Sequence, residues 1–394
     1  MMTQGLELTN KEPFKDVLIH GIVRDSQGRK MSKTLGNGID PLEIVDQYGA
    51  DSLRFSVLSG TTMGNDIRFM PEKLEQASNF ANKIWNAAKF ITNSISDDKD
   101  VIAFSNKVLK NKKFDEKLLK SEDQWIINKL NKLIFDVNRN FENYDLGVAL
   151  DNIYNFIWNE FCDWYIEMVK PRLYSDDKST KVQVSYVLDY VFRNCLKLLH
   201  PFMPFVTSEI YGKLVNYDST DLMVSSWPET LQNQDFDEEE HFIEKIKKLI
   251  VEIRNIRNQM NVHPSKKSKL IIITENGNKI KGVEEILLKL GFASKIEYEK
   301  SDKNIPNNAV SIVSDDIKLY IPFEELVDVS EEIKRLEKEK QRLESEVERG
   351  EKMLSNSGFI NKAPESKVNE EKEKLANYKN MLENVESRLK SFRK

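Results

Sequence analysis

Apolar residues recur at spacings of three and four along residues 71–211, and this regularity limits the possible folds more than any other feature of the chain. Such spacing places apolar side chains on one face of an α-helix. The four repeating sets begin at Ala77, Ile126, Leu146 and Val184. Four amphipathic helices with short connections predict a helix bundle. The lysine-rich stretch 97–120 is expected to be a loose excursion within that bundle.

Residues 329–394 carry a second regularity, the heptad spacing of apolar residues that is typical of coiled coils. Gly358 and Pro364 interrupt the heptads, and a helix cannot continue through that stretch. The sequence therefore predicts two helices that fold back on each other as an antiparallel coiled-coil hairpin, an arm. The alternative is that these heptads form an intermolecular coiled coil between two copies of the chain.

Between the bundle and the hairpin, the pattern is that of a small α/β module. A helix over about 240–260 is ended by Pro264. The predicted strands lie near 270–273, 294–299, 309–313 and 316–321, with a helix near 280–290. The chain is therefore predicted to be mainly α, and its length of 394 residues suits roughly two to three domains.

The start of the chain predicts mixed structure. A β-branched run at 17–23 reads as a strand, and a polar, glycine-marked loop follows at 24–38. Asp40 and Pro41 are favourable residues at the start of a helix, and Gly49 is favourable at its end. We divide the chain into segments 1–70, 71–240, 241–328 and 329–394.

Composition excludes several classes of protein. No apolar run approaches the ~18 residues of a membrane span, and the first residues lack the pattern of a secretory signal. Cys162 and Cys195 are too few for a disulfide framework or a four-thiolate site, so no structural metal is expected. These features predict a cytoplasmic protein without a membrane partner. The net charge of -5 does not by itself indicate a nucleic-acid binder.

The most specific local signal is the run Lys30-Met31-Ser32-Lys33-Thr34, which lies in the glycine-bounded loop. Two lysines three residues apart, with a hydroxyl between them, can converge on a polyphosphate. Each charge-assisted contact would contribute about 1.5–3 kcal/mol. On composition alone an ordinary basic surface loop is the simpler interpretation, and the surrounding residues decide between the two.

This run resembles the KMSKS signature of the class I aminoacyl-tRNA synthetases, with Thr34 in place of the usual serine. Residues 20–25, 36–37, 40–41 and 48–54 are similar to the signature's flanks in that class. Within the class, the chain is most similar to the valyl-tRNA synthetases. The segments that carry this similarity are 79–86, 200–205, 226–228, 253–262 and, near the hairpin turn, 359–364.

The resemblance implies an enzyme that attaches valine to tRNA(Val) with ATP and Mg²⁺ through a valyl-adenylate. Lys33 would contact the ATP phosphates with help from Lys30, and Met31, Ser32 and Thr34 would complete the ATP-binding loop. Residues 1–70 would be the end of the catalytic domain, with stem-contact helices. The other three segments would be the anticodon-binding bundle, a connecting helix with the α/β module, and a tRNA-binding arm.

One departure from the class pattern is large. The first class signature, HIGH, contains two histidines, and no two of the four histidines here are separated by two residues. The resemblance therefore implies a C-terminal portion, without the editing domain, that is inactive alone and monomeric. The alternatives are a non-catalytic helical protein that binds tRNA or other RNA, and the corresponding part of an isoleucyl or leucyl enzyme.

Contacts to tRNA are expected from aromatic and basic side chains. In the bundle the candidates are Trp158, which lies off the main apolar stripe, together with Lys170 and Arg172. Residues 329–394 contain 16 Lys/Arg and 14 Asp/Glu, a slight basic excess. The candidates there are Lys334, Arg335, Lys338, Arg342, Arg349, Lys362 and Lys367.

Overall fold

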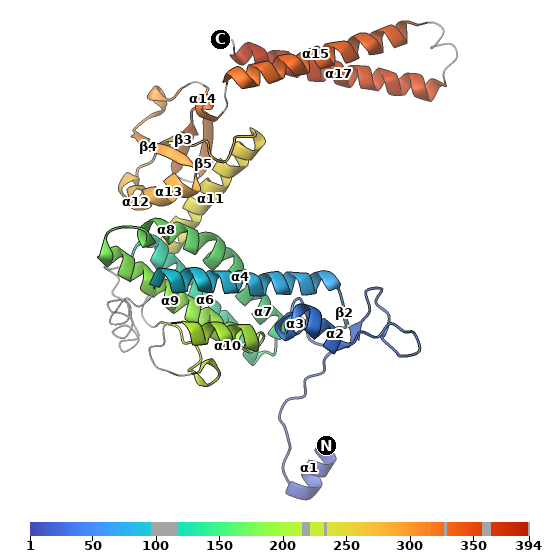
Figure 1. Cartoon of the computed structure of the whole chain (residues 1–394), viewed down its shortest axis with the longest axis vertical. Helices are drawn as coiled ribbons and strands as arrows, with labels where there is room; N and C mark the ends of the chain where they lie inside the picture. Colours follow the sequence, from blue (N-terminus) through green and yellow to red (C-terminus); the bar gives the residue numbers. More distant parts are fainter. Residues whose placement is uncertain are drawn as a thin grey trace. The chain divides into compact units, whose positions relative to one another are not determined.

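The computed structural model describes the chain except for residues 96–116, 118, 215–220, 232–234, 307, 315, 327–328, 357–363 and 393–394. The described part is mainly helical with two small sheets, as the sequence predicts at that level (Figure 1). It divides into two compact units, Met1–Lys247 and Lys248–Lys394. Most of the predicted excursion at 97–120 lies outside the described residues.

The first unit begins with helix α1 (Met2–Thr9) and an irregular segment. The strand predicted over 17–23 is wrong for most of its length, because only β1 (Val23–Arg24) forms, parallel to β2 (Ile67–Arg68). A strand requires a neighbour, and among the described residues β2 supplies partners for two positions only. Val17 and Ile19 are left 67% and 74% exposed.

Two short helices follow, and the first lies where the sequence predicts it. In α2 (Pro41–Tyr48), the Asp40 side chain caps the first turn by accepting from the Leu42 amide at 2.9 Å. Gly49, at φ +85°, separates α2 from α3 (Ala50–Leu58). A side chain is rarely tolerated at such a φ, which explains the glycine.

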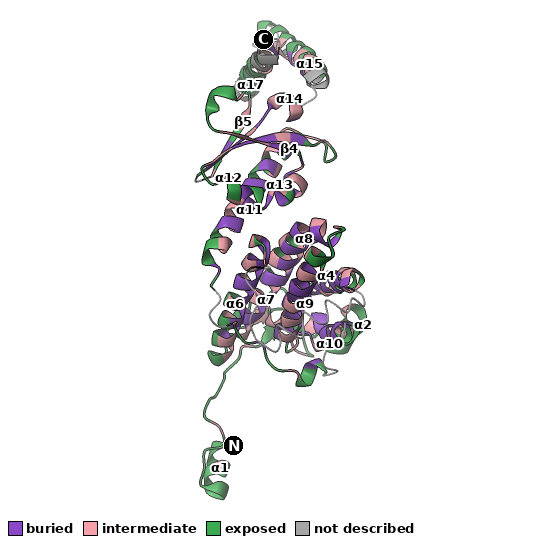
Figure 2. Cartoon of the chain, turned by 90° about the vertical axis from the view of Figure 1, so that its left-hand side faces the viewer, coloured by how far each residue is buried: buried purple, intermediate pink, exposed green. Residues whose placement is uncertain are grey.

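The predicted bundle is present as a set of helices that share one core. They are α4 (Pro71–Ile95), α6 (Ser121–Glu142), α7 (Leu146–Asn155), the π-helix η2 (Phe156–Tyr165), α8 (Ile166–Leu173), α9 (Lys178–Leu199) and α10 (Pro204–Lys213), followed by the 3₁₀ turn η3 (Leu222–Val224). Figure 2 shows buried residues along the faces where α4, α6, α7 and α9 meet. Phe161 of η2 stacks on Phe192 of α9, with ring centroids 5.8 Å apart. Burying each such side chain contributes about 1.5–3 kcal/mol.

Polar contacts fix α3 to the bundle. Asp51 accepts from the amides of Phe205 and Val206, at 3.2 and 2.6 Å, and so caps α10. Arg54 donates to the carbonyl oxygens of Pro201 and Phe202, at 2.8 and 3.1 Å. These contacts attach α3 to α10 and to the turn before it.

The second unit contains the small α/β module. Helix α11 (Asp237–Gln259) spans the boundary between the units. The sheet has the order β4-β3-β6-β5, with β3 parallel to β4 and the other pairs antiparallel. Its elements are β3 (Ser268–Ile273), α12 (Gly277–Lys281), α13 (Glu284–Leu290), β4 (Ala293–Glu299), η4 (Asp302–Asn304), β5 (Val310–Ser314), β6 (Ile317–Ile321) and α14 (Phe323–Leu326). The strands lie within one or two residues of their predicted positions.

Two long helices, α15 (Val329–Ser355) and α17 (Glu365–Phe392), end the chain. Their direction follows from two ion pairs, Lys340–Glu386 and Glu351–Lys379, each at 2.6 Å. As the residue number rises on one helix it falls on the other, so the helices run antiparallel. Gly358, the first predicted helix breaker, lies outside the described residues. No helix in the described ranges is long and apolar enough to cross a membrane.

Candidate functional site

The lysine loop, residues 30–34, is an exposed turn joined to β1. The backbone of Lys30 pairs with that of Arg24 in an isolated antiparallel β-bridge. Gly36, at φ +60°, lets the chain turn back. Lys30 and Lys33 are both exposed, and neither makes an ion pair with a described residue. The loop therefore presents two ammonium groups that a polyanion can reach.

The side chain of Asn37 holds the lysine loop in shape. Its Oδ1 accepts from the Ser32 amide at 3.0 Å, and its Nδ2 donates to the Lys30 carbonyl at 3.3 Å. The same Nδ2 donates to Asp25 at 2.9 Å. Within the loop, Ser32 Oγ accepts from the Leu35 amide at 3.3 Å.

Asp25 is the other half of this clamp. Its carboxylate is buried and accepts from the Arg29 amide and the Arg29 Nε, each at 2.7 Å, besides Asn37. The hydrogen bond from Asn37, followed by those from Arg29, lowers the pKa of Asp25 to about 2. Asp25 is therefore ionised at neutral pH and keeps its partners. We call Asp25 and Asn37 the loop clamp.

A second carboxylate anchors β1 beneath the loop. Asp66 accepts from the Ile22 amide at 2.8 Å and pairs with Arg24 at 2.5 Å. These contacts lower the pKa of Asp66, the Ile22 amide contributing most. Gly21 is required here, because a Cβ would lie 1.9 Å from the Asn65 carbonyl oxygen.

Sequence reasoning missed the clamp and the anchor as functional residues. Asp25 and Asn37 both lie in the flanks that carry the family resemblance, so a signal for them was present. Asp66 carries no comparable signal, because its role depends on the pairing of β1 with β2.

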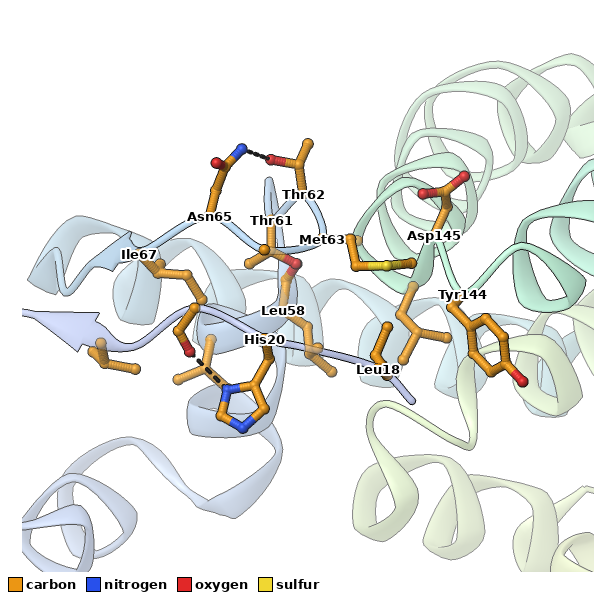
Figure 3. Close-up of a pocket in the computed structure, with 16 residues that line it drawn as sticks. Leu18, His20, Leu58, Thr61, Thr62, Met63, Asn65, Ile67, Tyr144 and Asp145 are labelled. Atoms are coloured by element: carbon orange, nitrogen blue, oxygen red, sulfur yellow. Dashed lines mark hydrogen bonds between the residues drawn. The ribbon is translucent and has the colours of Figure 1, made fainter. Parts of the chain in front are cut away.

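A separate pocket of about 280 Å³ lies beside the segment that precedes β1 (Figure 3). Its lining is mainly apolar and includes Leu18, Leu58 and Met63. His20 also lines it, and its Nδ1 lies 2.7 Å from the Gly21 carbonyl oxygen. The two lysines of the loop do not line this pocket, so its chemistry is not that of a phosphate site.

The prediction that Arg172 contacts tRNA is wrong, because this residue is 3% exposed. Its guanidinium donates to Glu122 and Asp123, each at 2.8 Å, and Tyr165 donates to Asp123 at the same distance. Burial opposes the charge of Arg172, but the two carboxylates outweigh it and raise its pKa. Arg172 is a structural cation of the bundle core.

The other two bundle candidates are partly engaged. Trp158 is half-buried, stacks on Tyr154 at 5.7 Å, and has Lys83 Nζ 3.8 Å from its ring centre. Lys170 pairs with Glu167 and lies 5.4 Å from the ring centre of Phe90. The structure therefore leaves Lys170 partly accessible, whereas one face of the Trp158 ring is already covered.

The candidates on the terminal helices differ in availability. Arg342 and Arg349 pair with glutamates one turn earlier, at 3.1 and 2.9 Å. Lys334, Lys338 and Lys367 are exposed and make no ion pair with a described residue. The side chain of Arg335 and all of Lys362 lie outside the described residues.

Cys162 and Cys195 belong to no cluster of metal ligands within the described residues. Burial raises the pKa of both thiols, that of Cys162 to about 12. Among the described residues, no group of three or more His, Cys, Asp or Glu side chains could hold a metal ion.

Three models of known families match this chain. Residues 1–70 match the model of class I tRNA synthetases for I, L, M and V, and residues 123–272 match the anticodon-binding domain of tRNA ligase. Together with the lysine loop, these matches define a class I aminoacyl-tRNA synthetase. Residues 328–393 match the tRNA binding arm of valyl-tRNA synthetase.

Curated relatives identify the family within that class. The chain is 47% identical to a valine–tRNA ligase of Clostridium tetani over 398 residues, and 44% identical to one of Clostridium acetobutylicum over 395 residues. A valine–tRNA ligase of Geobacillus stearothermophilus is 41% identical over 408 residues. Each match covers 100% of this chain and 44% of the relative. The chain belongs to the valyl-tRNA synthetase family and corresponds to a C-terminal portion, spanning less than half the length of these relatives.

Proposed function

We propose that this chain supplies the ATP-binding lysine loop and the tRNA-binding surfaces of a valine–tRNA ligase. The observation that carries the proposal is the lysine loop itself, in which two unpaired ammonium groups are held in place by the loop clamp. Unpaired cations on a fixed backbone suit the phosphates of ATP, because little reorganisation is needed when charge develops. The 47% identity to a valine enzyme favours valine over isoleucine or leucine.

ATP, when bound, would activate the carboxyl group of valine as an adenylate. Lys33 would contact the phosphates, Lys30 would assist, and Met31, Ser32 and Thr34 would shape the loop. The described residues offer no cluster of metal ligands, so Mg²⁺ would accompany the ATP phosphates. Alone, without a HIGH signature, the chain would bind tRNA(Val) but not activate valine.

The proposed domains follow the order of the matched families. Residues 1–70 would complete a catalytic domain and 71–240 would bind the anticodon. Residues 241–328 would connect these to residues 329–394, a coiled-coil arm that contacts tRNA. Leu336 and Leu343 on α15 and Val368 and Leu389 on α17 are buried, which supports a coiled-coil seam.

The protein would act as a cytoplasmic monomer. The antiparallel pairing of α15 with α17 uses the apolar faces that a dimeric coiled coil would need. Light scattering should therefore give the mass of one 45.9 kDa chain. Twice that mass would contradict the proposal.

A chimera tests the role of the lysine loop. Residues 1–394 would replace the matching portion of the Clostridium tetani enzyme, and valine-dependent exchange of pyrophosphate into ATP would be measured. Lys33→Ala should lower the exchange rate at least a hundredfold while valine binding is retained. The matched control, Lys11→Ala, removes an exposed lysine outside the loop and should have little effect. Exchange at an unchanged rate in the Lys33 variant would refute the assignment.

A further inference from the structure

Arg257, near the end of α11, is a buried cation without a negatively charged partner. It is 3% exposed, and its guanidinium donates to Ser268 Oγ at 3.2 Å and to the carbonyl oxygens of His263 and Lys266 at 3.2 and 2.6 Å. The ring centre of Phe292 lies 4.9 Å away. Within the described part of the chain no carboxylate pairs with it, unlike the buried Arg172. Burial accordingly lowers the pKa of Arg257.

These contacts fix the loop that joins α11 to β3, residues 261–267. Asn261 adopts a left-handed φ of +52°, and the Val262 amide donates back to the Arg257 carbonyl at 2.9 Å. The Lys266 amide donates to the His263 carbonyl at 3.0 Å, while His263 Nδ1 lies 2.7 Å from Ser265 Oγ. The loop is therefore ordered before any ligand arrives, which reduces the entropy lost on binding.

The same loop carries two further cations. Lys266 is partly exposed and Lys267 is exposed, and neither makes an ion pair with a described residue. On the neighbouring strands, by contrast, Lys269, Lys295 and Lys318 are paired with carboxylates. Three positive charges thus gather at this loop, whereas the three lysines of the sheet share two carboxylates, Glu297 and Asp302.

We propose that loop 261–267, near the end of the stretch that matches the anticodon-binding domain, binds a phosphate of the RNA backbone. This inference rests on the proposed function, which makes tRNA the partner. A phosphate has several oxygens that can accept at once from the two ammonium groups. The buried Arg257, which donates to two carbonyl oxygens of the loop and pairs with no described carboxylate, adds a third positive charge. An acidic protein segment would offer carboxylates in place of phosphates, and the test below distinguishes an RNA ligand from an acidic protein.

The test uses the whole 394-residue chain and a matched pair of lysine substitutions. Lys266→Ala with Lys267→Ala removes the cations of the loop. Lys300→Ala with Lys303→Ala removes two exposed, unpaired lysines after β4. Because β3 and β4 are parallel, the loop before β3 and the residues after β4 lie at opposite ends of these strands, roughly 20 Å apart.

Binding of tRNA would be measured at several salt concentrations. The loop variant should bind about tenfold more weakly, and the slope of log K against log salt should flatten by about 1–2, as expected for lost phosphate contacts. The control variant should keep the parent slope. Lys266→Arg with Lys267→Arg should keep it as well, because the charges remain. Unchanged circular dichroism would show that each variant is folded.

Three results would overturn the inference. Equal loss in the loop and control variants would show a general charge effect and would leave the proposed function intact. Lysine-dependent binding of polyglutamate with unchanged tRNA binding would identify an acidic protein as the occupant. No binding of tRNA by the parent chain would remove the proposed function, and the RNA role of the loop with it.

Discussion

At the scale of single residues, the loop clamp shows how uncharged and acidic side chains can control a basic site. Asn37 contacts the backbone on both sides of Met31 and also Asp25. The side chains of Lys30 and Lys33 make no ion pair with a described residue. The backbone that carries the two ammonium groups is therefore held by a carboxamide and a carboxylate.

Asn37→Ala should loosen the loop. It removes three hydrogen bonds, each contributing about 1 kcal/mol, so the loop should open at least tenfold more often. Trypsin should then cleave after Lys30 and Lys33 about tenfold faster. Gln27→Ala is the control, because Gln27 contributes only its backbone amide to Asp25. Equal cleavage rates in the two variants would show that Asn37 does not hold the loop.

Acid should release the clamp in a defined range of pH. The folded pKa of Asp25, about 2, lies below the ordinary aspartate pKa of 3.8, so ionisation of Asp25 stabilises the fold above pH 3.8, and this contribution is lost as the pH falls through about 2. The Arg29 amide should therefore stay protected from hydrogen exchange at pH 4. In Asn37→Ala the loss of protection should begin at a higher pH, because the largest cause of the shift is gone. An unchanged profile in that variant would contradict this cause.

At the scale of elements, the buried face of α8 determines the role of Arg172. Met168 and Val169 are buried on this helix, and Arg172 follows them at spacings of four and three. The periodicity that predicts the bundle thus also assigns Arg172 to its interior. What the sequence could not show is that Glu122 and Asp123, fifty residues away, supply the opposite charge.

Arg172→Met should destabilise the first unit strongly. It leaves two carboxylates buried without their cation, which costs about 3–5 kcal/mol. Lys170→Met, on the same helix but partly exposed, should cost less than about 1 kcal/mol. Urea unfolding of the two variants measures both values. Similar small losses would mean that the buried cluster is not held together by charge.

The terminal helices allow a comparison between free and paired cations. Replacing Lys334, Lys338 and Lys367 with alanine should weaken tRNA binding and flatten its salt dependence, because these side chains are available to phosphates. Arg342→Ala with Arg349→Ala should weaken tRNA binding less for each charge removed, since both arginines already pair with glutamates. Equal effects per charge in titrations with tRNA would show that the glutamates do not matter.

At the scale of the whole molecule, periodicity predicted the long helices, the small sheet and the two terminal helices, because each pattern reflects local burial. Pairing partners were harder to foresee. The run at 17–23 has the composition of a strand, yet only β1 finds a neighbour within the described residues. The family resemblance supplied what periodicity could not, namely the role that we propose for Lys30 and Lys33, since the charge of a lysine alone does not distinguish it from other surface lysines.

Capture of tRNA by the purified chain is the most direct test of the proposal that it supplies the tRNA-binding surfaces of a valine–tRNA ligase. The protein would be mixed with total tRNA from a bacterial cell, and the bound RNA would be recovered and sequenced. Valine acceptors should be enriched at least several-fold over their share of the input. Recovery of all tRNAs in proportion to their abundance would contradict the proposal that this chain selects tRNA(Val).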